Sequence, residues 1–191
     1  TIVSFENDLG SLELALADEH RVSFGFTEAS TKAARELLEK GTYATEHTTW
    51  RLSEGDFVES ITREPANSAD IVFWDFYSPK THPSLWNVST LRALRRVCRD
   101  GCTFHTYSTA TSLRAGLLLA GFAVGHGEPT GTRSETTLGA VTLADLSHPL
   151  GERWLERLER SHAAFPNDVG TDPGARTTAL DAVRACPQFR L

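Results

Sequence analysis

The run Ala69-Asp70-Ile71-Val72-Phe73-Trp74 constrains the fold of this chain more than any other segment. It is an almost continuous apolar run bounded by turn residues. This is the pattern of a parallel β-strand that is covered on both faces. The run therefore predicts a central strand of an α/β sheet, with Asp75 at its end.

Further β-rich runs and helix-like segments alternate along the chain. The β-rich runs lie at 1–5, 48–52, 101–107, 122–124 and 136–141. Helical patterns lie at 11–17, 30–40, 87–97, 111–120, 150–161 and 178–184. The alternation predicts a mostly parallel sheet with helices on both faces. The last two strands are joined without a helix, so we expect them to pair antiparallel. Residues 166–176 are rich in Gly, Pro and Asp and predict a flexible connection.

Composition places the chain among ordinary globular domains. It has 191 residues, of which 40% are hydrophobic and 23% are charged. We expect one main domain over residues 1–145, with residues 146–191 as a helical extension of the same domain. The net charge of -6 argues against a protein that coats nucleic acid non-specifically, but it leaves room for a local basic patch.

The sequence offers no sign of a membrane span, and its cysteines indicate a reducing compartment. No apolar run approaches the length that crosses a bilayer. The three cysteines form no CxxC pair, so we interpret them as reduced thiols in a cytoplasmic protein and expect no metal site.

Three acidic residues follow β-rich runs, namely Glu6, Asp56 and Asp75. Ligands of open α/β sheets bind at the carboxyl ends of the strands. There, Glu6 is placed to accept hydrogen bonds from a ribose diol, Asp56 to accept them from the amine of an adenine, and Asp75 to face a reacting centre. The alternative is that each residue simply ends its strand in water.

The segment after Asp75 resembles a known family. Trp74-Asp75-Phe76-Tyr77-Ser78-Pro79-Lys80-Thr81-His82-Pro83-Ser84-Leu85-Trp86 is similar to the motif of MnmC methyltransferase domains. Thr106-Tyr107-Ser108 resembles that family's segment after the fifth strand, and Arg114 with Gly121-Phe122-Ala123-Val124 resembles a later motif. Two segments depart from the pattern: His82 replaces an Asn, and the basic region is reduced to 131–135.

The resemblance implies a Rossmann-like class I methyltransferase that uses S-adenosyl-L-methionine. The expected acceptor is the exocyclic amine of a 5-aminomethyl-type wobble uridine in tRNA. The implied catalytic residues are Asp75, Tyr77 and Ser78, and Glu6, Asp56 and Asp75 would bind the cofactor. The implied substrate-binding residues are Lys80, His82 and Arg133.

The resemblance also implies segments that the sequence lacks. The family opens with a strand and a Gly-x-Gly turn, whereas this sequence starts at Thr1 in mid-pattern and contains no methionine. We therefore expect residues upstream, and we expect the present chain to have a gap in the middle of its sheet. We expect no flavin-dependent oxidase domain, as found in bifunctional members, within this chain.

Alternatives remain open at the level of function. The chain could be a small-molecule N- or O-methyltransferase, a relative of the aminopropyltransferases, or a non-catalytic nucleotide-binding domain. Cofactor binding would separate the last of these from the enzymes. A second open choice concerns the α-helical spacing of Arg92, Arg95, Arg96 and Arg99, which fits either a phosphate-binding stripe or a solvated helix face.

Overall fold

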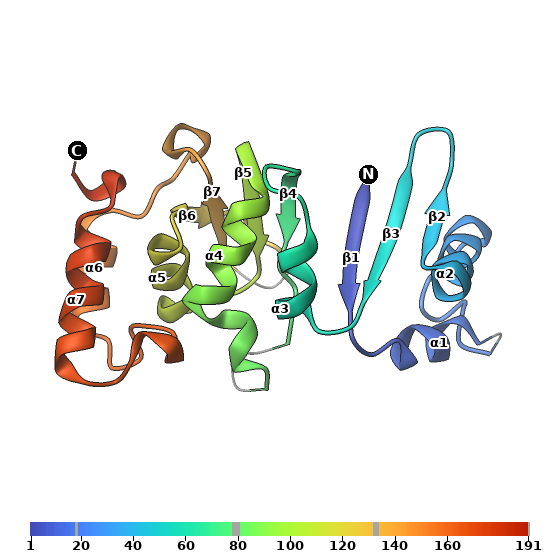
Figure 1. Cartoon of the computed structure of the whole chain (residues 1–191), viewed down its shortest axis with the longest axis horizontal. Coiled ribbons are helices and arrows are strands. Elements are labelled where there is room, and N and C mark those ends of the chain that lie inside the picture. The colour runs from blue at the N-terminus through green and yellow to red at the C-terminus, as the bar shows by residue number, and fades with distance from the viewer. Residues whose placement is uncertain (18, 78–80, 132–133, 191) are drawn as a thin grey trace. The chain divides into compact units, whose positions relative to one another are not determined.

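The computed structural model describes residues 1–17, 19–77, 81–131 and 134–190. These residues form two compact units, Thr1–Arg63 and Glu64–Leu191, and each unit has its own sheet (Figure 1). The strands alternate with helices in both units, which confirms the α/β class. The strands fall into two separate sheets, and a gap in the middle of one sheet stays a prediction.

The first unit holds a three-stranded sheet in the order β1-β3-β2. Strand β1 runs parallel to β3, and β2 runs antiparallel to it. The short strand β2 was not predicted from the sequence. The elements are β1 (Ile2–Glu6), α1 (Gly10–Leu16), α2 (Glu28–Lys40), β2 (Thr42–Ala44), β3 (Thr49–Glu54), α3 (Phe57–Ser60) and η1 (Ile61–Arg63).

Helix α2 shows why its predicted bounds were nearly correct. Thr27 and Ser30 form a reciprocal capping box that satisfies backbone N–H groups at the start of the helix. The helix ends at Gly41, whose φ of 69° lies in the left-handed region that glycine tolerates best. Leu37 on its inner face is buried.

The second unit holds a four-stranded sheet in the order β4-β5-β7-β6. Strands β4 and β5 are parallel, whereas β7 is antiparallel to both β5 and β6, as predicted for the final pair. The strands and longer helices are β4 (Ala69–Phe73), α4 (Val88–Val97), β5 (Cys98–Thr106), α5 (Thr111–Leu119), β6 (Ala123–Gly127), β7 (Thr136–Ala140), α6 (Glu152–Arg160) and α7 (Pro173–Arg184). The 3-10 turns are η2 (Pro83–Trp86), η3 (Leu143–Asp145), η4 (Asn167–Val169) and η5 (Pro187–Phe189).

Helices α4 and α5 lie side by side and supply much of the core of the second unit (Figure 1). Leu91, Leu94 and Val97 of α4 are buried, as their helical spacing predicts. The indole of Trp74 is buried as well and meets the ring of Phe104 at 5.8 Å. The core of this unit therefore lies between the sheet and these helices.

Within the second unit, one face of β4 is covered and the other is exposed. Ile71 and Phe73 are 51% and 73% exposed, although Trp74 next to them is buried. Strand β4 stands at the edge of its sheet and pairs with β5 alone among the described residues. Side chains alternate between the faces of a strand, so only the face that carries Trp74 is covered.

The C-terminal segment packs against the sheet of the second unit, and more of it is helical than the sequence predicted. We expected a flexible connection over 166–176, but α7 already begins at Pro173, with Asp172 as its N-cap. Proline at the first helical position and aspartate before it are helix-start signals. The side chain of Gln188 acts like a peptide group: it accepts a hydrogen bond from Val124 N at 2.8 Å and donates to Val124 O at 3.0 Å.

The same segment caps α4 from a distance in sequence. Asp168 accepts hydrogen bonds from the backbone N–H groups of Val88 at 2.9 Å and Ser89 at 3.0 Å. Asn87 occupies the N-cap position of α4 but makes no capping hydrogen bond with its own side chain. The carboxylate of Asp168 therefore accepts hydrogen bonds from N–H groups that have no partner within the helix, and its negative charge interacts favourably with the helix dipole.

A buried arginine ties α5 to β7. Arg114 is only 2% exposed, and it donates to Thr137 Oγ1 at 2.9 Å and to the carbonyl of Thr136 at 3.1 Å. It also forms an ion pair with Glu135, which His126 Nδ1 contacts at 2.9 Å. Burial raises the pKa of the Glu135 carboxyl, but the hydrogen bonds and charges of Arg114 and His126 outweigh burial and hold it below its usual range.

We predict that Asp168→Ala lowers the free energy of unfolding by about 1 kcal/mol, because α4 loses its capping carboxylate. Thermal and denaturant unfolding of the purified protein would measure the loss. Asp145→Ala is the matched control, since Asp145 is an exposed carboxylate in η3 without a capping role. Equal stability of the two variants would show that Asp168 contributes no cap.

The ion pair between Glu135 and Arg114 predicts that the free energy of unfolding depends on pH. A carboxyl whose pKa is depressed in the folded state stabilises the fold above its unfolded pKa of about 4.3, and this stabilisation is lost as the pH falls through the folded pKa. We expect Glu135→Gln to be less stable than the wild type at neutral pH and to lose less stability on acidification. Parallel slopes for the two proteins in denaturant titrations below about pH 4.3 would contradict this prediction.

Candidate functional site

The carboxyl ends of the two parallel strands in the first unit bring two predicted residues to one edge. Strands β1 and β3 pair with Glu6 opposite Glu54, and Asp56 follows two positions later. Gly55 links the two ends, because its N–H donates to the carbonyl of Glu6 at 2.9 Å. Both carboxylates are exposed. The sequence-based placement of Glu6 and Asp56 at one sheet edge therefore agrees with the fold of this unit.

Each of these carboxylates also has a local partner. Glu6 Oε1 accepts backbone N–H groups from Asn7 at 2.9 Å and Asp8 at 3.2 Å. Asp56 is the N-cap of α3 and accepts from Glu59 N at 3.1 Å through Oδ1. One oxygen of each carboxylate thus orders the local backbone, which fixes the direction of the other.

Asp75 stands at the corresponding edge of the second unit. The register pairs Phe73 with His105 and Thr106 with Thr137. The carboxyl ends of β4 and β5 and the amino end of β7 consequently lie together. Asp75 is exposed at this edge. Its convergence with Glu6 and Asp56, which belong to the first unit, stays a prediction.

The segment after Asp75 presents two rings at the surface. Tyr77 is 71% exposed, and its ring lies 5.8 Å from that of His82, with 31° between the ring planes. Ser78 and Lys80, predicted in the same segment, lie outside the described residues, and so does Arg133. The structure therefore brings Tyr77 and His82 together and leaves the other three as predictions.

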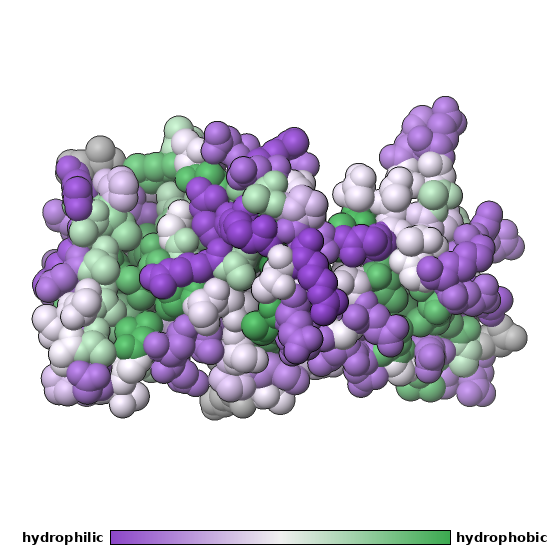
Figure 2. Space-filling view, viewed as in Figure 1, coloured by the Kyte–Doolittle hydropathy of each residue, from purple (hydrophilic) through white to green (hydrophobic). Residues whose placement is uncertain are grey.

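The arginines of α4 have protein partners. Arg92 donates to the carbonyl of Leu119, and Arg95 donates to the carbonyls of Gly121 and Cys98. Arg96 donates to the carbonyl of Glu64. Arg99 lies in β5, beyond the end of α4, so the predicted helical stripe does not include it; it pairs with the carboxylate of Asp70. Figure 2 shows hydrophilic side chains gathered over this helix. These arginines already bind groups of the protein. They are therefore neither a purely solvated face nor unpaired groups available to bind phosphate.

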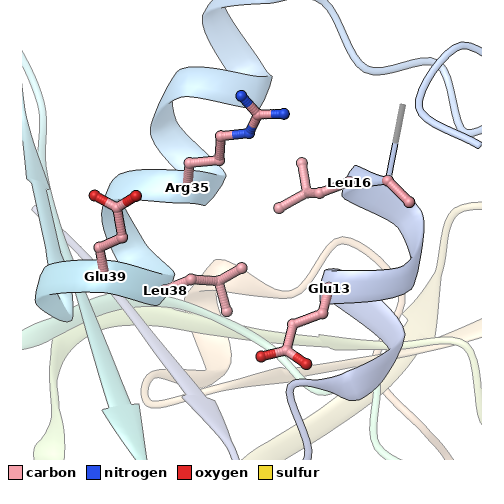
Figure 3. A pocket seen from close by; sticks show the side chains of 6 residues that line it. Glu13, Leu16, Arg35, Leu38 and Glu39 are labelled. Atoms are coloured by element: carbon pink, nitrogen blue, oxygen red, sulfur yellow. The ribbon is translucent and has the colours of Figure 1, made fainter.

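Each unit has a hollow among its described residues. In the first unit, an open groove of about 330 Å³ lies between α1 and α2, where Leu16 and Leu38 point toward each other and Glu13 stands at the rim (Figure 3). In the second unit, a small cavity of about 50 Å³ lies between η2, α5 and η4. Neither is lined by a residue that the sequence predicted for the site. We therefore place the candidate site from strand topology and not from cavities.

Sequence reasoning missed the donors that hold the segment after Asp75. Tyr107 Oη donates to the carbonyl of Phe76 at 3.1 Å, and Trp86 Nε1 donates to the carbonyl of Tyr77 at 2.9 Å. Trp86 is 4% exposed, and no local pattern in the sequence reveals the acceptor of its N–H. The contact between His126 and Glu135 also had no sequence signal.

Over the part of the chain that the structure describes, no cluster of three or more His, Cys, Asp or Glu side chains has the arrangement of a metal site. The same residues include no helix with the length and apolar character needed to cross a bilayer. Cys98 and Cys102 are buried free thiols, and burial raises the pKa of both.

Comparison with protein families gives a match over most of the chain. A family described as S-adenosyl-L-methionine-dependent methyltransferases matches residues 25–142. This range includes Asp56, Asp75 and the segment that resembles MnmC. The match covers more than half of the chain.

Curated relatives and a solved structure agree with the family. The tRNA 5-methylaminomethyl-2-thiouridine biosynthesis bifunctional protein MnmC of Paracidovorax citrulli is 41% identical over 66 residues, which are 35% of this chain and 10% of the relative. The protein of the same name from Ralstonia nicotianae is 34% identical over 92 residues, 48% of this chain and 14% of the relative. The aligned part therefore spans about a tenth of the length of these relatives.

The crystal structure of MNMC2 from Aquifex aeolicus has the same fold. It superposes with a TM-score of 0.64 and 22% identity, and the match covers 96% of this chain and 67% of that one. The fold, the family match and the segment after Asp75 all point the same way. This chain belongs to the family of S-adenosyl-L-methionine-dependent methyltransferases and is an MnmC-like methyltransferase domain.

Proposed function

We propose that this domain methylates the exocyclic amine of a 5-aminomethyl-type wobble uridine in tRNA, with Asp75 as the residue that holds the amine. The carrying observation is the position of Asp75: it is exposed at the carboxyl edge of the β4–β5 pair, and the two backbone carbonyls that follow it are hydrogen-bonded. The names of the curated relatives support tRNA as the class of substrate.

The residues of the first unit fit the cofactor that the family implies. Ribose hydroxyls and an adenine amine are hydrogen-bond donors, and a carboxylate accepts two or more such bonds. Glu6 and Asp56 offer exposed carboxylates at one sheet edge, which matches that donor set. We assign Glu6 to the ribose and Asp56 to the adenine. When bound, S-adenosyl-L-methionine supplies an electrophilic methyl group on a sulfonium.

The protonation state of the acceptor amine determines what the protein side chains have to do. A primary alkylamine is mostly protonated at neutral pH, yet it attacks only through its free electron pair. Removal of water around it lowers its pKa, whereas a nearby carboxylate raises it. Asp75 therefore does not activate the amine by itself. Its role is to hold the nitrogen in line and to stabilise the positive charge that develops there during transfer.

Tyr77 and His82 complete the proposed acceptor site, together with Ser78, Lys80 and Arg133. The exposed ring of Tyr77 adds apolar surface beside Asp75, which would help to exclude water. The ring of His82 lies against that of Tyr77. In this proposal Tyr77 and Ser78 shape the pocket around the reacting amine, while Lys80, His82 and Arg133 contact the tRNA.

We predict that Asp75→Ala and Asp75→Asn lower kcat by about 10²-fold or more, because the developing charge loses its partner. Methyl transfer to tRNA that carries the free 5-aminomethyl group would be measured with the full-length protein. Asp100→Asn is the matched control: Asp100 is an exposed carboxylate near the amino end of β5, at the opposite edge of the same sheet. Wild-type turnover by Asp75→Ala would remove Asp75 from the mechanism.

Cofactor binding gives a separate test. We expect Glu6→Gln to weaken binding of S-adenosyl-L-methionine about 10-fold to 100-fold in calorimetry, since a charged acceptor is lost. Asp56→Ser should also weaken binding, while it keeps an oxygen that can cap α3. Glu46→Gln, in the turn between β2 and β3, is the control. Cofactor binding without methylation of tRNA would favour a small-molecule acceptor, and no binding would favour a non-catalytic domain.

A further inference from the structure

Two consecutive backbone carbonyls after Asp75 receive hydrogen bonds from side chains elsewhere in the second unit. The hydroxyl of Tyr107 donates to the carbonyl of Phe76 at 3.1 Å. The indole N–H of Trp86 donates to the carbonyl of Tyr77 at 2.9 Å. The backbone next to Asp75 is thus held at two adjacent positions, from two different elements.

Tyr107 directly follows β5, which is an inner strand of its sheet. Strand β5 pairs with β4 on one side and with β7 on the other. The next residue, Ser108, is fixed as well, because its carbonyl accepts a hydrogen bond from Thr137 Oγ1 at 2.6 Å. Thr137 in turn accepts from the buried Arg114 at 2.9 Å. A chain of hydrogen bonds therefore connects the position of Tyr107 to α5 and β7.

Trp86 is held by packing. Its side chain is 4% exposed and meets the indole of Trp74 edge to face, with 6.4 Å between the ring centroids and 90° between the planes. Trp74 also meets the ring of Phe76 at 4.7 Å. The second donor is therefore an indole packed in an aromatic cluster with Trp74 and Phe76, the two residues that flank Asp75 in the sequence.

We infer that Tyr107 and Trp86 are positioning residues that set the direction of the Asp75 side chain. The segment after Asp75 contains prolines, and its described residues 75–77 and 81–82 lie outside the strands, so donors from other elements direct the two held carbonyls. Asp75 is one peptide away from the first held carbonyl. A displacement of about 1 Å at a reacting group can cost 10²-fold in rate, so such donors matter to turnover. This inference rests on the proposed role of Asp75.

A purely structural role would give a different result from a positioning role. If the two hydrogen bonds only stabilise the fold, their removal lowers overall stability and leaves turnover of the folded protein unchanged. If they position Asp75, their removal loosens residues next to Asp75 and lowers kcat, while the KM for the cofactor is unchanged. Local hydrogen exchange near Asp75, and a fall in kcat without a change in KM, therefore distinguish a positioning role from a structural role.

The test uses Tyr107→Phe, which removes one hydroxyl and keeps the ring. We expect peptides covering residues 73–77 and 81–87 to exchange amide hydrogens faster, and kcat to fall about 10-fold, the loss expected for one misdirected contact. Tyr43→Phe is the matched control, because the hydroxyl of Tyr43 in β2 has no hydrogen-bond partner among the described residues. Unchanged exchange and unchanged kcat in Tyr107→Phe would overturn the inference.

Trp86→Phe and the double variant complete the design. Trp86→Phe keeps an aromatic ring but loses the N–H, and the exchange near Asp75 should rise further when both donors are absent. Faster exchange over the whole second unit, with normal kcat, would show a structural role and overturn the inference. The exchange measurement needs no substrate, so a wild-type protein inactive on tRNA would defeat the proposed function while the loop contacts were still tested.

Discussion

The pairing of β5 with its two neighbours is the constraint on which the second unit depends. Parallel pairing with β4 places Phe73 opposite His105, so Asp75 follows at the same edge of the sheet as Thr106. Antiparallel pairing with β7 brings Thr137 to the same level from the other side. Side chains that are distant in sequence therefore meet at one edge because of main-chain hydrogen bonds, before any specific side-chain contact is considered.

A buried charge then links that edge to the helices. A lone guanidinium in a protein interior is strongly unfavourable, because it loses its hydration. Arg114 avoids this cost by donating to Thr137, to the carbonyl of Thr136 and to Glu135. The same geometry that satisfies Arg114 also holds the segment after β5, since Thr137 donates onward to Ser108. The hydrogen bonds that satisfy the charge of Arg114 therefore also hold the backbone next to Tyr107.

Periodicity in the sequence was enough to predict most of the elements, because burial patterns are local. The buried Leu91, Leu94 and Val97 of α4 follow directly from helical spacing. The strand β2 was missed because three residues carry too little pattern, and the early start of α7 was missed because Pro173 was interpreted as a loop residue. The exposure of Phe73 was not foreseen, since an apolar run does not show whether its strand stands at an edge.

The residues of the candidate site also differ in whether a local sequence pattern predicts them. Residues that end strands, such as Glu6, Asp56 and Asp75, could be named from the sequence because strand ends are visible in it. Contacts made across the fold could not. The donor to Tyr77 O comes from nine residues away, and the cap of α4 comes from Asp168, 80 residues after Val88. Such pairs depend on tertiary packing, which no local pattern of one chain encodes.

The arginines of α4 show how this affects the case for an RNA substrate. A stripe at helical spacing invites a phosphate-binding interpretation, but Arg92 and Arg95 hydrogen-bond to carbonyls around the end of α5. The C-terminal carbonyls of a helix lack partners within the helix, so cations placed there stabilise the fold whether or not RNA is present. This structural use is sufficient to account for both residues. The tRNA proposal therefore depends on the segment after Asp75 and on the relatives, and not on the charge of this helix.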